Sequence, residues 1–176
     1  NCPDGFKLTV FDAIIRAKLV YGLEVIHIPK FLIQKLNCFQ LKGLRKILNL
    51  QTTYMDRANT NQKVFQLANA KKNPKQVPGK NIQSFEGYLR DTQKSLVKHI
   101  VRLPDQDPLR QSTLEPSSIS PYNVINRRVG RPRGNWAWSS FESVYVDSHF
   151  GTSQQFKQDP SAALSAMEHA IRNRQI

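Results

Sequence analysis

The chain has 176 residues, and its 26 Lys and Arg against 13 Asp and Glu give a formal net charge of +13 and a pI near 10.0. This length excludes several large domains. No apolar run approaches the roughly 20 residues that span a bilayer, and two cysteines are too few for a disulfide framework or a zinc cluster. We therefore expect an intracellular protein of the nucleus or cytoplasm, without a membrane partner, whose natural ligand is a polyanion such as nucleic acid.

The first predicted element is a helix over residues 6–21. It is apolar around most of its circumference, with Asp12 and Arg16 on a narrow polar edge, so it is expected to be largely buried. Gly22 is predicted to end it, and residues 23–28 read as a short extended piece.

A second helix is predicted over residues 30–48, because Pro29 suits the start of a helix. At 100° per residue, seven residues share one broad apolar face: Leu32, Ile33, Leu36, Phe39, Gly43, Leu44 and Ile47. Four basic residues fall on the opposite side: Lys35, Lys42, Arg45 and Lys46.

Two more helices are predicted over residues 60–69 and 84–103. The second has the clearest apolar stripe, to which His99 belongs as a packed, hydrogen-bonded residue rather than a catalytic one. Its opposite side carries a basic residue at every fourth position: Arg90, Lys94, Lys98 and Arg102.

The second half of the chain is predicted to be less regular. Residues 71–80 and 104–121 are Pro-bearing loops, and the aromatic residues of 136–150 follow neither the helical nor the strand period. Asp159 and Pro160 predict a capped helix that runs to about residue 173.

These patterns predict a mainly α protein. A small helical bundle is expected over residues 1–103, then a Pro/Ser-rich linker with an irregular basic segment over residues 104–138, and a C-terminal tail with one helix over residues 139–176.

The positive charge is concentrated in the predicted bundle. Residues 1–103 hold 18 basic and 6 acidic residues, a net charge of +12, whereas residues 135–176 have a net charge of −1. Basic helix surfaces are often merely solvated, but such surfaces usually mix both signs of charge. No Asp or Glu occurs between Pro29 and Leu50, and the helix over residues 84–103 has only Glu86 and Asp91. The two basic rows therefore favour binding to a phosphate backbone.

A separate basic strip, RRVGRPRG, follows at residues 127–134. Gly and Pro prevent a helix there, and arginine binds phosphate in a bidentate manner, so the strip resembles arms that enter a groove or wrap RNA. A nuclear localisation signal or a charged linker is the alternative. Trp136 and Trp138 are expected to anchor the strip to its own domain rather than to stack on bases. The arginines of the strip are Arg127, Arg128, Arg131 and Arg133.

No self-contained active site is evident. Two-metal catalysis needs carboxylates that converge on a pair of Mg²⁺ ions, and the only close acidic pair, Asp105 and Asp107, reads as a loop-capping feature. The sequence contains no phosphate-binding glycine loop and no nucleophile elbow. We expect no catalytic residue, metal site or cofactor in this chain.

Four blocks in order resemble the reverse transcriptases of non-LTR, LINE-like retrotransposons. They are VFDAIIRAKLVYGLE at residues 10–24, KLNCFQLKGLRKILNL at residues 35–50, KHIVRLPDQDPLR at residues 98–110 and RRVGRPRGNW at residues 127–136. The resemblance implies a thumb and the connection after it. It places the Asp-Asp pair and its Mg²⁺ in a palm upstream of Asn1, and makes that palm and the fingers partners of this region.

The resemblance implies a non-catalytic fragment of an RNA-directed DNA polymerase that grips a primer–template or RNA backbone. The alternative is a standalone basic helical module, nuclear or RNA-associated, that binds an acidic protein partner or RNA.

Overall fold

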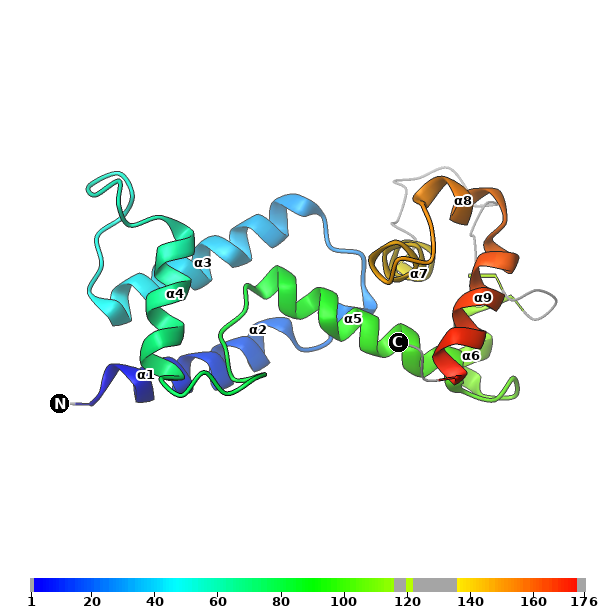
Figure 1. Ribbon diagram of the computed structural model, residues 1–176, viewed down its shortest axis with the longest axis horizontal. Coiled ribbons are helices and arrows are strands. Elements are labelled where there is room, and N and C mark those ends of the chain that lie inside the picture. The colour runs from blue at the N-terminus through cyan, green and yellow to red at the C-terminus, as the bar shows by residue number, and fades with distance from the viewer. Residues whose placement is uncertain (1, 116–119, 122–135, 174–176) are drawn as a thin grey trace. The chain divides into compact units, whose positions relative to one another are not determined.

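The computed structural model describes residues 2–115, 120–121 and 136–173 (Figure 1), and in these residues the protein is mainly α-helical, as predicted. The chain divides into two compact units. The first comprises Asn1–Glu24 and Ile28–Arg90, and the second comprises Val25–His27 and Asp91–Ile176. The division falls inside helix α5 (Phe85–Arg102), not near residue 103.

The first unit begins with three helical segments in direct succession: α1 (Asp4–Val10), the π-helical η1 (Phe11–Arg16) and α2 (Ala17–Val20). Gly22 follows with a φ of 75°, a left-handed conformation that favours glycine and stops a helix. The predicted extended piece over residues 23–28 is wrong in its first half, where the 3₁₀ turn η2 (Leu23–Val25) forms.

The prediction that this first helix is largely buried is wrong. Only Leu8, Asp12 and Val20 are buried in it, and Phe6 remains 62% exposed. A π-helical turn takes up an extra residue, so the side chains after it are rotated away from the positions that a 3.6-residue period assigns. The period read from the sequence therefore does not identify the buried face across η1.

Asp12, predicted on the polar edge, is 5% exposed. The ammonium group of Lys72 lies 2.5 Å from its Oδ2 atom, and a guanidinium nitrogen of Arg16 lies 3.5 Å from Oδ1. A buried carboxylate is tolerated only when it is paired in this way. The guanidinium of Arg16 also lies 4.5 Å from the ring centroid of Tyr88.

Helices α3 (Lys30–Leu48) and α4 (Asn61–Lys72) complete the main core of the first unit. The prediction of α3 is confirmed at both ends, and Asn49 caps it in the left-handed conformation. The Thr60 side chain accepts a hydrogen bond from the Lys63 backbone N–H and caps α4, which begins one residue later and ends three residues later than predicted. The buried residues of this core are Leu8, Leu41, Leu44, Leu48, Val64, Ala68 and Ile82.

Gln40 is a buried polar residue that joins α3 to the start of α5. Its Nε2 donates to the carbonyl oxygen of Gln83 at 2.7 Å, and its Oε1 accepts from the Phe85 N–H at 3.0 Å. The latter bond satisfies a backbone donor at a helix N-terminus, where no partner exists within the helix.

Gly5 allows α1 to approach α4 closely. A Cβ atom at Gly5 would lie 2.6 Å from the carbonyl oxygen of Lys71. Because helical backbone cannot move away cheaply, Gly5→Ala is expected to reduce the free energy of unfolding by about 1–3 kcal/mol. Urea unfolding followed by hydrogen exchange of α4 peptides measures this.

The control for this substitution is Gly87→Ala in α5, where the new Cβ would meet side-chain atoms alone, the Ser84 hydroxyl at 3.2 Å and the Gln83 Cβ at 4.0 Å. It is expected to cost less than Gly5→Ala. Equal stability of Gly5→Ala and the native chain would contradict the close contact between α1 and α4.

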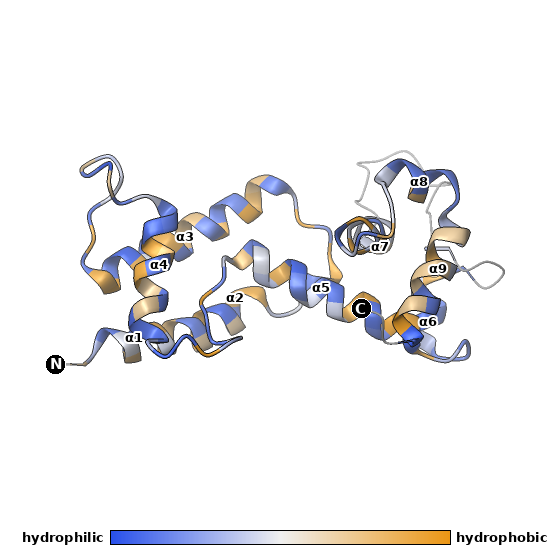
Figure 2. Ribbon diagram, in the orientation of Figure 1, coloured by the Kyte–Doolittle hydropathy of each residue, from blue (hydrophilic) through white to orange (hydrophobic). Residues whose placement is uncertain are grey.

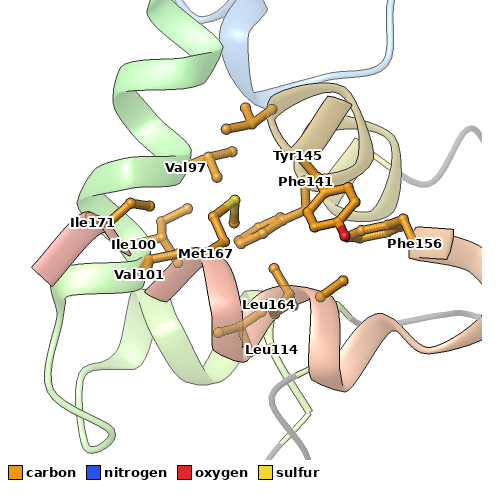
Figure 3. Packing of buried hydrophobic residues seen from close by; sticks show 12 residues of the cluster. Val97, Ile100, Val101, Leu114, Phe141, Tyr145, Phe156, Leu164, Met167 and Ile171 are labelled. Carbon is orange, nitrogen blue, oxygen red and sulfur yellow. The ribbon is translucent and has the colours of Figure 1, made fainter. Parts of the chain in front are cut away.

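The second unit contains the C-terminal part of α5, then α6 (Pro108–Thr113), α7 (Trp136–Asp147), α8 (Ser153–Gln158) and α9 (Pro160–Arg172). Side chains from α5, α7, α8 and α9 meet in one apolar core (Figure 3). Its larger members are Val97, Ile100, Val101, Leu114, Phe141, Val144, Tyr145, Phe156, Leu164, Met167 and Ile171.

The C-terminal region therefore contains two helices more than predicted. Helix α9 is confirmed, with the Asp159 side chain accepting from the Ala162 N–H and Pro160 at the first position. Helix α8 begins with a capping box of Thr152 and Gln155. Helix α7 was not predicted, because apolar residues lie around most of its circumference and show no clear helical period.

Two further predictions about the second unit need correction. His99 is exposed rather than packed in the core. The segment over residues 104–121 is not entirely loop, since it contains α6, which the Asp107 side chain caps by accepting from the Leu109 N–H at 2.8 Å. The capping role predicted for Asp107 is thus confirmed.

Arg110 is a buried charged residue that the sequence did not single out. Its guanidinium donates to the Val101 carbonyl oxygen at 2.9 Å and pairs with Asp105 at 3.1 Å and Glu168 at 3.6 Å. Because Glu168 lies on α9 and Val101 on α5, Arg110 connects α5, α6 and α9.

Candidate nucleic-acid interface

Among the described residues, helix α3 carries three exposed lysines on the side opposite its core. Its core side is formed by Leu41, Leu44 and Leu48. On a helical wheel, Lys35, Lys42 and Lys46 fall opposite Leu44, within about 40° of one another, and all three are exposed. Figure 2 shows hydrophilic and hydrophobic residues alternating along α3.

The three lysines have no acidic partner among the described residues. None of the ion pairs in the described part of the chain involves Lys35, Lys42 or Lys46, and α3 contains no Asp or Glu. Because a salt bridge would have to be broken before a phosphate could bind, unpaired lysines are the better phosphate ligands.

Two phenylalanines lie among these lysines. Phe31 is 54% exposed and Phe39 is 50% exposed, and the ammonium group of Lys35 lies 5.8 Å from the ring centroid of Phe31. With Lys42 and Lys46 they form what we call the lysine–phenylalanine face: Phe31, Lys35, Phe39, Lys42 and Lys46.

The position of Phe39 corrects the predicted apolar face, which included Phe39 and Leu32. Both residues are exposed. The predicted face was too broad: α1 and α4 cover the side of α3 centred on Leu44, and residues at the margin of the face stay in water. The sequence contained a signal for their exposure: Phe31 and Phe39 each lie four residues from Lys35, and residues four apart lie on the same side of a helix.

Arg45, predicted to belong to the basic side, binds within the first unit instead. Its Nη2 donates to the carbonyl oxygen of Asn59 at 3.2 Å and to Oδ1 of Asn61 at 2.8 Å. The side chain therefore ties the end of α3 to the start of α4, and its charge lies to one side of the three lysines.

The predicted basic row on α5 is partly neutralised. Arg90 lies 3.9 Å from Glu86, and Lys94 pairs with Asp147 of α7 at 3.2 Å. The prediction overlooked Asp147 because it lies more than fifty positions away in the sequence. Lys98 is half-buried and Arg102 is exposed, and neither takes part in the ion pairs of the described residues.

The four arginines of the predicted strip, Arg127, Arg128, Arg131 and Arg133, lie outside the described residues. The two tryptophans after them pack against the second unit's core, and the Trp138 ring meets Phe156 edge-on at a centroid distance of 5.5 Å. The tryptophans thus pack within their own unit, and whether they anchor the strip stays a prediction because the strip lies outside the described residues.

An open apolar groove of about 410 Å³ lies beside α1 and η1. Phe6, Val10 and Ile14 contribute to it from successive turns, Ile47 of α3 adds to its wall, and Lys7 is its charged member. The groove is suited to apolar contact rather than to phosphate.

The described residues contain neither a metal-binding cluster nor a helix that could span a membrane. No group of three or more His, Cys, Asp or Glu side chains there is placed to hold a metal ion. No helix in the same residues has the length and apolar character needed to cross a membrane.

Comparisons of the chain with protein-family models, with curated proteins and with solved structures found no match.

Proposed function

We propose that this chain is a non-catalytic fragment of a retroelement RNA-directed DNA polymerase that holds nucleic acid through basic helix faces, chiefly that of α3. The observation that carries the proposal is the set of three exposed, unpaired lysines on α3. The four ordered motif blocks support the retroelement origin. Catalysis, with its Mg²⁺, belongs in this proposal to an upstream palm.

The physical basis is counterion release. A nucleic-acid backbone is a regular line of negative charge, and each lysine that neutralises a phosphate frees a condensed cation. Lys35 and Lys46, the outer two of the three lysines, are eleven residues apart, which corresponds to about 16 Å along the helix axis. Several phosphates of one strand lie within that length, so the three lysines can act on the same strand.

Such contacts position a nucleic acid without reading its sequence. Lysine is a compact point charge, and contacts to phosphate carry no sequence information directly. The proposed role is therefore a sequence-independent grip, which is what a polymerase needs as its template advances.

We expect Lys35→Gln, Lys42→Gln and Lys46→Gln together to weaken binding to all sequences alike. Each neutralised phosphate contributes about −0.7 to −0.9 to the slope of log K against log salt, so the triple variant should reduce the slope by about 2–3. Fluorescence anisotropy of labelled RNA, DNA and hybrid at a series of salt concentrations measures both quantities.

The matched control is the triple glutamine variant of Lys18, Lys75 and Lys80. These are exposed lysines of the first unit, and their replacement removes the same charge. Its salt slope should stay close to that of the native chain. Equal losses in the two triple variants would mean that only net charge matters, and salt-independent affinity would refute the grip.

The second candidate function is an interaction module with a protein partner. The exposed apolar row of Phe6, Val10 and Ile14 favours it, because a charged phosphate backbone gains nothing from such a surface. Translation of the genomic DNA upstream of Asn1 discriminates the two. A Tyr/Phe-x-Asp-Asp turn in frame supports the polymerase fragment, and an unrelated nearby start codon supports the module.

A further inference from the structure

We propose that the lysine–phenylalanine face of α3 selects single-stranded nucleic acid, with bases stacked on Phe31 and Phe39 and phosphates bound by Lys35, Lys42 and Lys46. This inference rests on the proposed function and adds to it the strandedness of the ligand. It follows from the presence of aromatic rings among the lysines, which a surface that binds only backbone does not need.

The exposure of the two rings is the first argument. Phe31 and Phe39 leave 54% and 50% of their surface in water, although α3 buries its apolar residues on the other side. An exposed apolar group becomes stabilising when a partner covers it. The partner must also carry negative charge, because the surrounding residues are unpaired lysines. A nucleic acid provides both properties, since every base has an apolar face and every nucleotide a phosphate.

The spacing along α3 is the second argument. Phe31 and Phe39 are eight residues apart, about 12 Å along the helix axis, and lie within about 80° of arc with the three lysines. Lys35 lies midway, with its ammonium group 5.8 Å from the Phe31 ring centroid. A nucleic-acid strand that lies along this face therefore passes an aromatic ring, a lysine and a second aromatic ring, and then two further lysines.

Strandedness follows from the accessibility of the bases. In a duplex the bases are stacked on one another, and a convex helix surface presents its rings only to the outer backbone. In a single strand the bases can turn outwards and stack on an aromatic side chain, a contact that tolerates any sequence. The lysines can bind the phosphates of a duplex or of a single strand, whereas only the bases of a single strand can stack on Phe31 and Phe39.

The test compares three fluorescent probes of equal length on the full chain at one salt concentration: oligothymidylate, a blunt duplex, and an abasic strand with the same phosphates. We expect oligothymidylate to bind at least about tenfold more tightly than the abasic strand, and Phe31→Ala with Phe39→Ala to remove that advantage. Binding of the duplex and of the abasic strand should be unchanged.

The matched control replaces two exposed aromatic residues elsewhere in the first unit, Phe6→Ala with Tyr54→Ala, and should leave all three affinities unchanged. Phe31→Trp with Phe39→Trp keeps the stacking surfaces and should retain the preference. A second readout uses Cys38, an exposed thiol on α3. In a Cys2→Ser background, oligothymidylate should slow its alkylation.

The outcomes separate this inference from the proposed function. Salt-dependent binding that is equal for all three probes, and unaffected by loss of the two rings, overturns the stacking role and leaves the backbone grip intact. Failure to bind any probe at low salt overturns both. A Phe31→Ala, Phe39→Ala variant with a native circular dichroism spectrum that loses affinity for the duplex and the abasic strand by the same factor as for oligothymidylate also overturns the stacking role.

Discussion

Replacement of Lys72 by methionine is expected to lower the free energy of unfolding of the first unit by about 3 kcal/mol, because it leaves the Asp12 carboxylate buried with a weaker partner. Lys72 is the nearer cation, at 2.5 Å, and its side chain is only 12% exposed. Arg16 remains at 3.5 Å, which keeps the loss at the lower end of the range for broken buried pairs. Hydrogen exchange of α3 and α4 peptides during urea unfolding measures the change.

The neighbouring residue provides the control. Lys71 pairs with Asp4 at 2.6 Å, but its side chain is 47% exposed, and an ion pair in water is screened and contributes little to stability. Lys71→Met should therefore cost much less than Lys72→Met. In the double variant Asp12→Leu, Lys72→Met the unpaired charge is gone and most of the stability should return. A double variant that is as unstable as the sum of the single ones would contradict a buried ion pair.

Arg110→Met is the corresponding prediction for the second unit, with an expected loss of about 3 kcal/mol. The substitution keeps an apolar chain in place and removes the guanidinium, so the buried Val101 carbonyl loses its donor and Glu168 loses one of two cations. Arg110→Lys should recover only part of the loss, because an ammonium group cannot reproduce the planar fork that meets three acceptors.

Both tryptophans of the chain lie in the second unit, so their fluorescence reports its unfolding. Arg172→Met is the matched control, since Arg172 pairs with the same Glu168 at 2.7 Å but has a side chain that is 55% exposed. It should shift the urea midpoint little. If Arg110→Met and Arg172→Met shifted it equally, Arg110 would not be the buried connection between α5, α6 and α9.

The helices that could be predicted well are those whose signals are local. Pro29 at the start and the loss of apolar periodicity after Leu48 define α3, and Asp159 with Pro160 defines the start of α9. Caps and first-turn prolines act within a few residues, so a single sequence contains them fully. Helix α7 lacked such a signal, and residues 139–176 were therefore predicted to be a tail with one helix.

The candidate interface was predictable in part. Lys35, Lys42 and Lys46 follow directly from helical spacing and the absence of acids nearby. Arg45 satisfies the same criteria, yet it binds Asn59 and Asn61. Spacing assigns a side of the helix, but it does not show which neighbouring loop covers the margin of that side.

The sequence by itself determined the mainly helical class, the position of the basic charge and the separation of lysines from the core on α3. Only the tertiary structure decided which charges are neutralised: Asp12 meets Lys72, Lys94 meets Asp147, and Arg110 meets Glu168. It likewise decided that Phe31 and Phe39 stay in water. The reason is that local periodicity fixes the direction of a side chain from its own helix axis, whereas burial and pairing depend on elements that the chain brings there from far away.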